Sequence, residues 1–265
     1  MIDWPAALPL VLTGLALVCG LMFVLWLIHF PIRNAAIVDV GWGTALATLA
    51  TTYAVMGTGL AERRWLLAAT VIVYGLRLSL YLFTTRIWGH PEEGRYVELR
   101  REWAPNAALR FLLFYEFQAL IAVVLSLPFL AAAMNPAPEI RAVEWAALAL
   151  WVVAKLGESL ADWQLHRFKS RAENKGRVCD EGLWRYSRHP NYFFEWLIWV
   201  AWALYGASSP GGWMGWLSPA LMLYFLFRVT GIPATEAQAL RSKGEAYRRY
   251  QERTSAFVPM PVRQA

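Results

Sequence analysis

The sequence predicts an all-α membrane protein with about seven transmembrane helices, built as a single domain over residues 1–265. Hydrophobic residues make up 58% of the chain and charged residues only 17%, whereas charged residues are roughly 25% of an ordinary soluble domain. Mean hydropathy is +0.36. The chain also contains several runs of the ~20 mostly apolar residues that a helix needs to cross a bilayer. We therefore expect the chain to lie in a lipid bilayer.

The expected spans are separated by short segments rich in Gly, Pro and charge, such as residues 90–94 and 208–212. The residues before the first span contain no Lys or Arg, so we interpret that span as retained rather than as a secretory signal. No internal repeat and no long linker is visible. In chain order, the expected spans are 8–28, 36–57, 65–87, 110–134, 142–163, 191–206 and 214–230.

The positive charges predict the orientation of these spans. Lys and Arg concentrate in the loops after the odd-numbered spans and in the tail from Arg228 onward, whereas the opposite loops carry Arg63, Arg64 and Arg141. Because Lys and Arg near span ends favour the cytoplasmic side, the N-terminus should lie outside and the C-terminus in the cytoplasm. The net charge of +6 then suits anionic lipid headgroups. No nucleic-acid-binding module accompanies it, so nucleic acid is not an expected partner.

Common soluble chemistries are not supported by the sequence. Cys19 lies inside the first span and Cys179 in a cytoplasmic loop, so no disulfide is expected between them. The four histidines show no HExxH or CxxC pairing, and we expect no metal. Neither a Walker A sequence nor a GxGxxG turn is present, which excludes the soluble nucleotide folds that use them.

Polar residues inside the spans are the main functional signal, because an ionisable group in the membrane is costly and by default marks a functional site. In the third span Tyr74, Arg77 and Tyr81 share one helix face. They predict a polar cavity open to the cytoplasm, or else interhelical pairs such as Asp39 with Arg77 and Lys155 with Glu158. Further polar or aromatic residues in the spans are Asp39 and Trp42 in the second, Glu116 and Gln118 in the fourth, Lys155, Glu158 and Asp162 in the fifth, and Asn191, Glu195 and Trp199 in the sixth.

The most specific stretch is GLWRYSRHPNYFFE at residues 182–195. Pro190 suits the first turn of a helix, where its missing N–H is not needed. Arg185, Arg188 and His189 then crowd the positive end of that helix, which favours a bound anion such as phosphate. The alternative is that they are ordinary cytoplasmic anchors of the span.

Three segments carry a family resemblance, namely this stretch, the YGLRLSLY segment at 74–81 and the tail with Tyr247, Tyr250 and Phe257-Val258-Pro259. They resemble the membrane-embedded steroid 5α-reductases and their sterol-reductase relatives, whose bacterial branch is described as domain of unknown function 1295. The resemblance covers most of the chain. It implies NADPH as cofactor, with most of its site in residues 142–265. The implied cofactor residues are Arg77, Tyr81, Asp162, Lys169, Arg171, Arg185, Arg188, His189, Asn191, Tyr192, Glu195 and Arg228.

The resemblance also implies a reaction, hydride transfer from NADPH to the conjugated C=C of a 3-oxo-Δ4 steroid or a similar lipid enone. Tyr74 would donate to the enone oxygen. The animal enzymes pair this Tyr with a Gln-Glu dipeptide, and Asp39 is our candidate for the acid here. Trp42, Glu116 and Trp199 are expected at the substrate, an apolar molecule entering from the bilayer. The expected location is the bacterial inner membrane, with the cofactor site facing the cytoplasm.

Two other functions fit parts of the sequence. Isoprenylcysteine-type carboxyl methyltransferases share an Arg-His-Pro signature but use S-adenosylmethionine, which lacks phosphates. The basic cluster of Lys169, Arg171, Arg185, Arg188 and Arg228 suits a pyrophosphate and a 2′-phosphate better. A transporter or scaffold is the other alternative, although inverted repeats and broken helices, which are typical of transporters, are not visible.

Overall fold

The computed structural model describes residues 3–229 and 231–262, and the chain divides into two compact units. Unit 1 comprises Met1–Ala142 and Tyr205–Leu217, and unit 2 comprises Val143–Leu204 and Ser218–Ala265. Throughout the described ranges the regular elements are helices, and the one β-type pairing described is an isolated bridge between Ser187 and Ser255. An all-helical architecture was predicted, and the structure confirms it.

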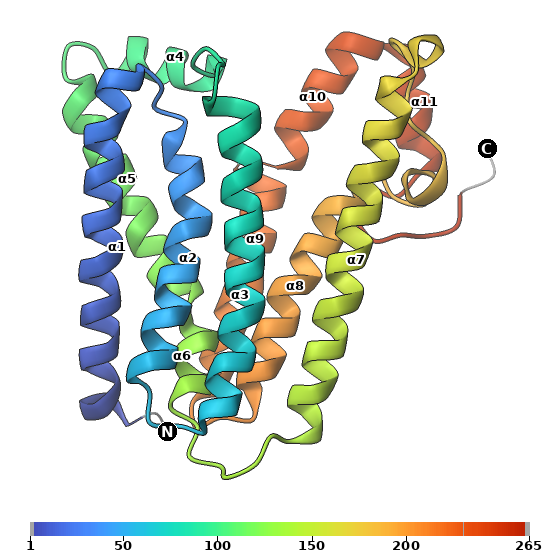
Figure 1. Ribbon diagram of the computed structural model, residues 1–265. Helices are drawn as coiled ribbons and strands as arrows, with labels where there is room; N and C mark the ends of the chain where they lie inside the picture. Colours follow the sequence, from blue (N-terminus) through green and yellow to red (C-terminus); the bar gives the residue numbers. More distant parts are fainter. Residues whose placement is uncertain (1–2, 230, 263–265) are drawn as a thin grey trace. The chain divides into compact units, whose positions relative to one another are not determined.

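Unit 1 contains α1 and α2, α3 followed by the π-helical turn η1, the short helix α4, then α5 and α6, and later the 3₁₀ turn η4 (Figure 1). Asp3 caps α1, since its carboxylate accepts from the Ala6 N–H at 3.4 Å. The bounds are α1 Trp4–Ile32, α2 Ile37–Met56, α3 Ala61–Leu82, η1 Phe83–Ile87, α4 Gly94–Glu102, α5 Ala107–Leu125, α6 Leu127–Ala133 and η4 Gly212–Trp216.

Helices α2 and α3 share the most extensive helix–helix contact described in unit 1. A Cβ added to Gly75 would lie 2.3 Å from the Gly43 carbonyl oxygen, so only glycine permits this approach. Next to it, the Ser79 hydroxyl donates to the Val40 carbonyl at 2.7 Å. Helix α1 packs beside α2 and α5, and α4 crosses the end of the unit that lies opposite the N-terminus (Figure 1).

The expected span 110–134 is divided, which corrects the prediction of one continuous helix there. Helix α5 ends at Leu125 and α6 begins at Leu127. Pro128 lies in the first turn of α6, where it has no N–H to offer and its ring disfavours continuation of the preceding helix. Ser126 at the break donates to the Val123 carbonyl at 2.8 Å and lies 3.2 Å from the Tyr53 hydroxyl.

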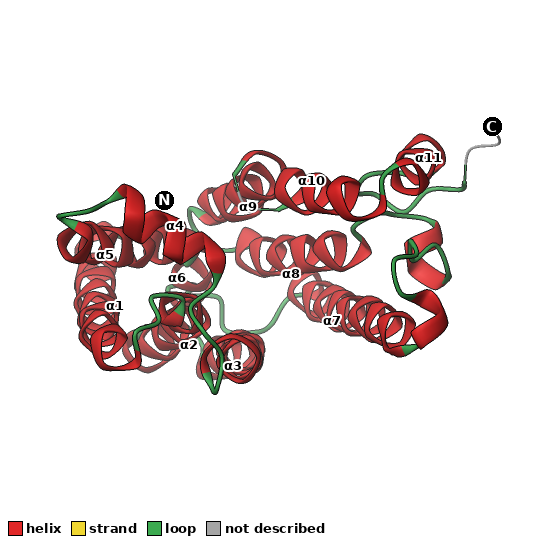
Figure 2. Cartoon of the chain, turned by 90° about the horizontal axis from the view of Figure 1, so that it is seen from above, coloured by secondary structure: helices red, strands yellow, loops and turns green. Residues whose placement is uncertain are grey.

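Unit 2 contains α7, most of α8, and α9, α10 and α11, and α8 lies between α7 and α9 (Figure 2). Gly157 of α7 faces the Phe194 ring of α8, and the Trp196 indole N–H donates to the Pro219 carbonyl of α9 at 3.0 Å. The bounds are α7 Ala142–Ser170, η2 Ala172–Asn174, η3 Gly182–Arg185, α8 Pro190–Ala207, α9 Leu217–Arg228, α10 Ile232–Lys243 and α11 Glu245–Arg253.

The helices are those of an integral membrane protein. Four helical stretches are long and apolar enough to cross a bilayer. They are α1 Trp4–Ile32, α3 with η1 over Ala61–Ile87, α5 Ala107–Leu125, and the stretch Gly212–Lys243 that includes η4, α9 and α10. The remaining expected spans also fall on helices, α2, α7 and α8, while the total of seven spans and their orientation stay predictions. The last residue of the span 214–230 lies outside the described residues.

Candidate functional site

The candidate site of unit 2 is built on residues 182–189, the segment that joins α7 to α8. Gly182 begins it with a positive φ of 59°, which favours glycine. The following N–H, that of Leu183, donates to the Gln164 side-chain oxygen at 2.8 Å, and the Trp184 indole donates to the Ala161 carbonyl at 2.9 Å. These two hydrogen bonds attach the segment to the half of α7 that is expected to lie on the cytoplasmic side.

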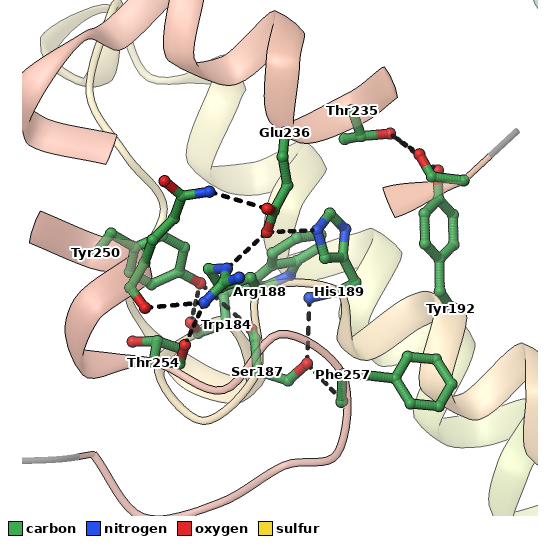
Figure 3. Close-up of polar contacts among 12 residues, drawn as sticks. Trp184, Ser187, Arg188, His189, Tyr192, Thr235, Glu236, Tyr250, Thr254 and Phe257 are labelled. Carbon is green, nitrogen blue, oxygen red and sulfur yellow. Dashed lines mark hydrogen bonds and ion pairs between the residues drawn. The ribbon is translucent and has the colours of Figure 1, made fainter. Parts of the chain in front are cut away.

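Arg188 joins this segment to the C-terminal helices (Figure 3). Its Nε donates to Glu236 Oε1 at 2.7 Å, and its Nη1 donates to the carbonyls of Gln251 at 2.9 Å and Thr254 at 2.6 Å. Only 11% of the side chain is exposed. The guanidinium is thus committed to partners within unit 2.

His189 shares the same carboxylate. Its Nε2 lies 3.3 Å from Glu236 Oε1, and its ring stacks on Tyr192 with 5.4 Å between ring centroids. Gln251 completes the set by donating to Glu236 Oε2 at 2.8 Å. The sequence predicted an anion facing Arg188 and His189, and the structure supplies one from the chain itself. Their assignment to a cofactor phosphate stays a prediction.

Two tyrosines of α11 complete this cluster. Tyr250 donates to the Trp184 carbonyl and lies 3.3 Å from the Ser187 carbonyl oxygen. Burial raises the pKa of Tyr250 well above its ordinary value, and burial followed by the nearby Glu236 charge raises that of Tyr247 to about 12. Both phenols therefore stay protonated at neutral pH.

Two of the predicted cofactor residues meet on the facing sides of α7 and α8. Asn191 Nδ2 donates to Asp162 Oδ1 at 3.1 Å, although the residues are 29 positions apart. Glu195, half-buried, follows one turn later on α8. The expected neutralisation of Lys155 by Glu158 is confirmed, with Nζ 2.6 Å from Oε2. The pairing explains why two polar residues are present in α7 without requiring a bound ligand.

Four other predicted cofactor residues are exposed cations. Among residues 3–229 and 231–262 none of the four forms an ion pair. They differ in this respect from Arg188, and they are among the basic side chains of unit 2 that remain able to meet an external anion. These residues are Lys169, Arg171, Arg185 and Arg228.

In unit 1, Asp39 is held by partners that the sequence did not indicate. The Tyr96 hydroxyl donates to its Oδ1 at 2.7 Å, and Arg86 Nη1 lies 3.3 Å from its Oδ2. Arg86 therefore takes the place expected for Arg77 as the cation beside Asp39. Tyr74 is buried at 2% exposure, and a direct contact between Asp39 and Tyr74 stays a prediction.

A second carboxylate, Glu92, fastens the segment before α4. It accepts from the Ala35 N–H at 2.7 Å and from Arg100 Nη2 at 2.7 Å. Burial alone would raise the pKa of Glu92, but the hydrogen bonds from Arg100 and Ala35 outweigh burial and hold it below the ordinary value. Burial, and then the Asp39 charge, raise the pKa of Tyr96 far above its usual range.

The other predicted residues have varied surroundings. Arg77 and Tyr81 are exposed on α3, Trp42 is half-buried on α2, and Glu116 of α5 lies beside the Cys19 thiol. Trp199 of α8 is fully buried. Within the described part of the chain, no three His, Cys, Asp or Glu side chains are grouped as a metal ion would need.

Sequence reasoning missed the residues that complete both clusters, Glu236 and Gln251 in unit 2 and Tyr96 and Glu92 in unit 1. All lie outside the apolar runs, where a charged or aromatic residue is unremarkable. The one available signal was electrostatic, since Arg188 requires a counter-charge and Glu236 is the first acidic residue after the last span.

Comparison with known proteins finds one family and one curated relative. The family model described as "Protein of unknown function (DUF1295)" matches residues 25–254. An uncharacterized protein of Schizosaccharomyces pombe is 27% identical over 273 residues, an alignment that covers 93% of this chain and 78% of the yeast protein. No solved structure matches the chain.

Proposed function

We propose, from the premise that this chain belongs to the DUF1295 family, that it is an NADPH-dependent membrane reductase. Its substrate would be the conjugated C=C of a 3-oxo-Δ4 steroid or a similar lipid enone. The observation that carries this proposal is the hydrogen bond between Asp162 and Asn191. These residues were assigned to one cofactor site from distant parts of the sequence, and they meet across α7 and α8.

The residues of unit 2 fit the chemistry of the cofactor. Its phosphates require cations, and Lys169, Arg171, Arg185 and Arg228 are exposed and able to provide them. Its amide and hydroxyl groups require donors and acceptors, which Asn191, Asp162 and Glu195 supply. Arg188 and His189 contribute less than the sequence suggested, because Glu236 already binds both side chains.

Bound NADPH would supply the hydride. Tyr74, on α3 of unit 1, would donate its phenol hydrogen to the enone oxygen, which becomes negative as the β-carbon is reduced. Such a donor accelerates the reaction because its hydrogen bond strengthens in the transition state. Asp39 was proposed to support Tyr74, and with Tyr96 and Arg86 bound to it its more direct role is to position the segment that carries Tyr96.

Nucleotide binding by the purified full chain tests the cofactor half. Arg171→Ala or Arg228→Ala should weaken NADPH by about 1.5–3 kcal/mol, the free energy of a hydrogen bond to a charged group. Arg241→Ala is the matched control, since Arg241 is also an exposed cation of unit 2. Unchanged affinity in both site variants would remove these residues from the site.

Turnover of a 3-oxo-Δ4 steroid tests the chemical half. Tyr74→Phe keeps the ring but removes the donor, so kcat should fall ~10²–10³-fold while NADPH affinity stays close to that of the wild type. Glu195→Gln keeps the shape of the side chain and removes its charge. Lower nucleotide affinity at unchanged thermal stability places Glu195 at the cofactor, whereas lower stability alone makes it part of the scaffold.

One observation favours a second candidate, an S-adenosylmethionine-dependent methyltransferase of the isoprenylcysteine carboxyl methyltransferase type. One of the five residues in the predicted phosphate cluster, Arg188, is not available to a phosphate, because it is bound to Glu236. The preference for a phosphate-bearing cofactor is weakened accordingly. Identifying the nucleotide retained on purification in mild detergent separates the two candidates. Retained NADPH or NADP⁺ supports the reductase, and retained S-adenosylmethionine or S-adenosylhomocysteine supports the methyltransferase.

A further inference from the structure

A pocket in unit 1 has no part in the proposed reaction. It measures about 480 Å³ and lies between the segment that follows α6 and the segment that precedes η4. We call it the loop pocket. The residues lining it that bear on its chemistry are Asn135, Pro136, Ala137, Arg141, Ser208 and Ser209.

Three side-chain atoms of the loop pocket are buried without a hydrogen-bond partner. They are Asn135 Nδ2, Ser208 Oγ and Ser209 Oγ. Asn135 is 1% exposed and Ser209 is 7% exposed. Buried polar atoms are nearly always paired in folded proteins, so three orphans lining one pocket require an explanation.

Several acceptors around the loop pocket already receive hydrogen bonds from the chain. Asn135 Oδ1 accepts from the Ala137 N–H at 3.1 Å, which also fixes the side-chain amide with Nδ2 as the unpaired end. Arg63 donates to the carbonyls of Asn135 at 3.3 Å and Ala137 at 2.8 Å, and Arg141 donates to the Ser208 carbonyl at 3.3 Å. The atoms left over are one amide donor and two hydroxyls.

A site whose unpaired atoms are one amide donor and two hydroxyls favours a ligand that brings oxygen acceptors. Arg141 lines the same pocket, and Arg63, which is fully buried, lies behind its carbonyls. Each brings a guanidinium to this region, and the carbonyls of Asn135, Ala137 and Ser208 each already accept a hydrogen bond, which makes a cation the less suitable ligand. The chemistry therefore suits an anion with several oxygens.

The neighbouring residues place the loop pocket at the depth of the lipid headgroups. The turn η4 begins just after Pro210, and its Trp213 and Trp216 are 75% and 43% exposed. Exposed Trp residues at the ends of spans are enriched at the membrane–water interface. A phosphate group at this depth can come from a lipid or from the solution.

We propose that the loop pocket binds a phosphate-type oxyanion, with Asn135 Nδ2 and the hydroxyls of Ser208 and Ser209 as donors. Serine hydroxyls rotate freely about their Cβ–Oγ bond, so both can turn their hydrogens toward the ligand. This site lies in unit 1 and is independent of the reductase proposal.

The test uses the purified full chain and the double variant Ser208→Ala/Ser209→Ala, with Ser242→Ala as matched control because Ser242 is an exposed serine of α10. One arm titrates inorganic phosphate against chloride at constant ionic strength and follows the unfolding temperature. The other adds phosphatidic acid or diacylglycerol, the same lipid without its phosphate, and counts bound lipid by native mass spectrometry.

We expect the double variant to bind the phosphate ligand at least about tenfold more weakly than wild type and the control. It should unfold at the wild-type temperature in chloride, since neither hydroxyl has a partner to lose. A response to phosphatidic acid alone identifies a lipid headgroup as the ligand, and a response to inorganic phosphate identifies the free ion. If neither ligand distinguishes the double variant from wild type, the loop pocket is not an anion site.

A second variant provides an independent test of the proposal. Asn135→Asp keeps the oxygen that accepts from Ala137 but replaces the unpaired donor with a charged oxygen, so it should repel phosphate more strongly than the serine variant. Binding of phosphate to Asn135→Asp with wild-type affinity would contradict the proposal, even if the serine variant behaved as expected.

Discussion

Asp39 in unit 1 and Glu236 in unit 2 each bind an arginine and an aromatic side chain, but the two arginines are committed to very different degrees. Arg86 beside Asp39 is 42% exposed and is shared with Glu93 at 3.1 Å. Arg188 beside Glu236 is 11% exposed and also holds two backbone carbonyls. From this comparison we expect an arginine's contribution to stability to depend on its burial and on the backbone that it holds, and not on the presence of a carboxylate alone.

The largest loss of stability is expected when Arg188, the largely buried arginine, is removed. Arg188→Ala leaves Glu236 without its main partner and frees the carbonyls of Gln251 and Thr254. Breaking a largely buried ion pair on one side costs about 3 kcal/mol or more. The free energy of unfolding in detergent should fall by that amount, and hydrogen exchange should speed up over residues 182–189 and 245–255. Arg185→Ala, an exposed neighbour, should leave both measurements unchanged. Equal effects of the two variants would remove the distinction between the clusters.

A smaller loss is expected from the Asp39 cluster. Tyr96 is 1% exposed and donates to Asp39 at 2.7 Å. Tyr96→Phe removes only that hydroxyl, so the cost should be about 2 kcal/mol, the value for a hydrogen bond to a charged group. Faster exchange should be confined to α4 and the start of α2. If Tyr96→Phe destabilised the protein more than Arg188→Ala, the ranking of the two clusters would be reversed.

Acid should weaken unit 1 through Glu92. The pKa of Glu92 is held below its ordinary value in the folded protein, so its contribution to stability is fully present above the unfolded value of ~4.3 and is lost as the pH falls through the folded value. Glu92→Gln should therefore cost about 1 kcal/mol at pH 6 and less at pH 3. Unfolding temperatures at the two pH values provide the measurement, and a difference between variant and wild type that is the same at both would contradict this role.

The smallest effect is expected at an ion pair of unit 2 that lacks the burial of Arg188. Arg253 contacts Asp180, and the two side chains are 46% and 48% exposed. Exposed pairs contribute about 0–1 kcal/mol and are screened by salt. Arg253→Ala should change the free energy of unfolding by less than about 0.5 kcal/mol, and 0.5 M NaCl should reduce even that. A large loss here would mean that exposure does not govern the strength of these pairs.

Much of the fold could be predicted because apolar length is a property of the sequence alone. The expected spans 36–57 and 191–206 correspond to α2 Ile37–Met56 and α8 Pro190–Ala207. The break between α5 and α6 was missed because hydropathy measures how apolar a segment is and not whether its helix is continuous. Pro128, which lies in the apolar run, was the available signal. The helices α10 and α11 were missed as elements because they are polar, and packing against residues 182–189 rather than composition explains their position.

Contacts could be anticipated where both residues lie in expected helices. Lys155 with Glu158 was expected as a pair, and Asp162 and Asn191, which meet in the structure, were assigned to one cofactor site. Helical spacing identifies the face on which such residues lie. It fails where the partner comes from a segment without periodicity. Nothing in the spacing of Arg188 indicates Glu236, 48 residues later, because that contact depends on how the chain folds back after α9.

The glycine contact between α2 and α3 bears on how the protein is made. The two helices are consecutive, joined by a short turn, and fit together at Gly43 and Gly75 without any side chain from elsewhere. In lipid, close backbone packing of this kind is itself a source of helix association. We therefore expect residues 37–82 to pair as a helical hairpin in the bilayer, onto which later segments can assemble as synthesis proceeds.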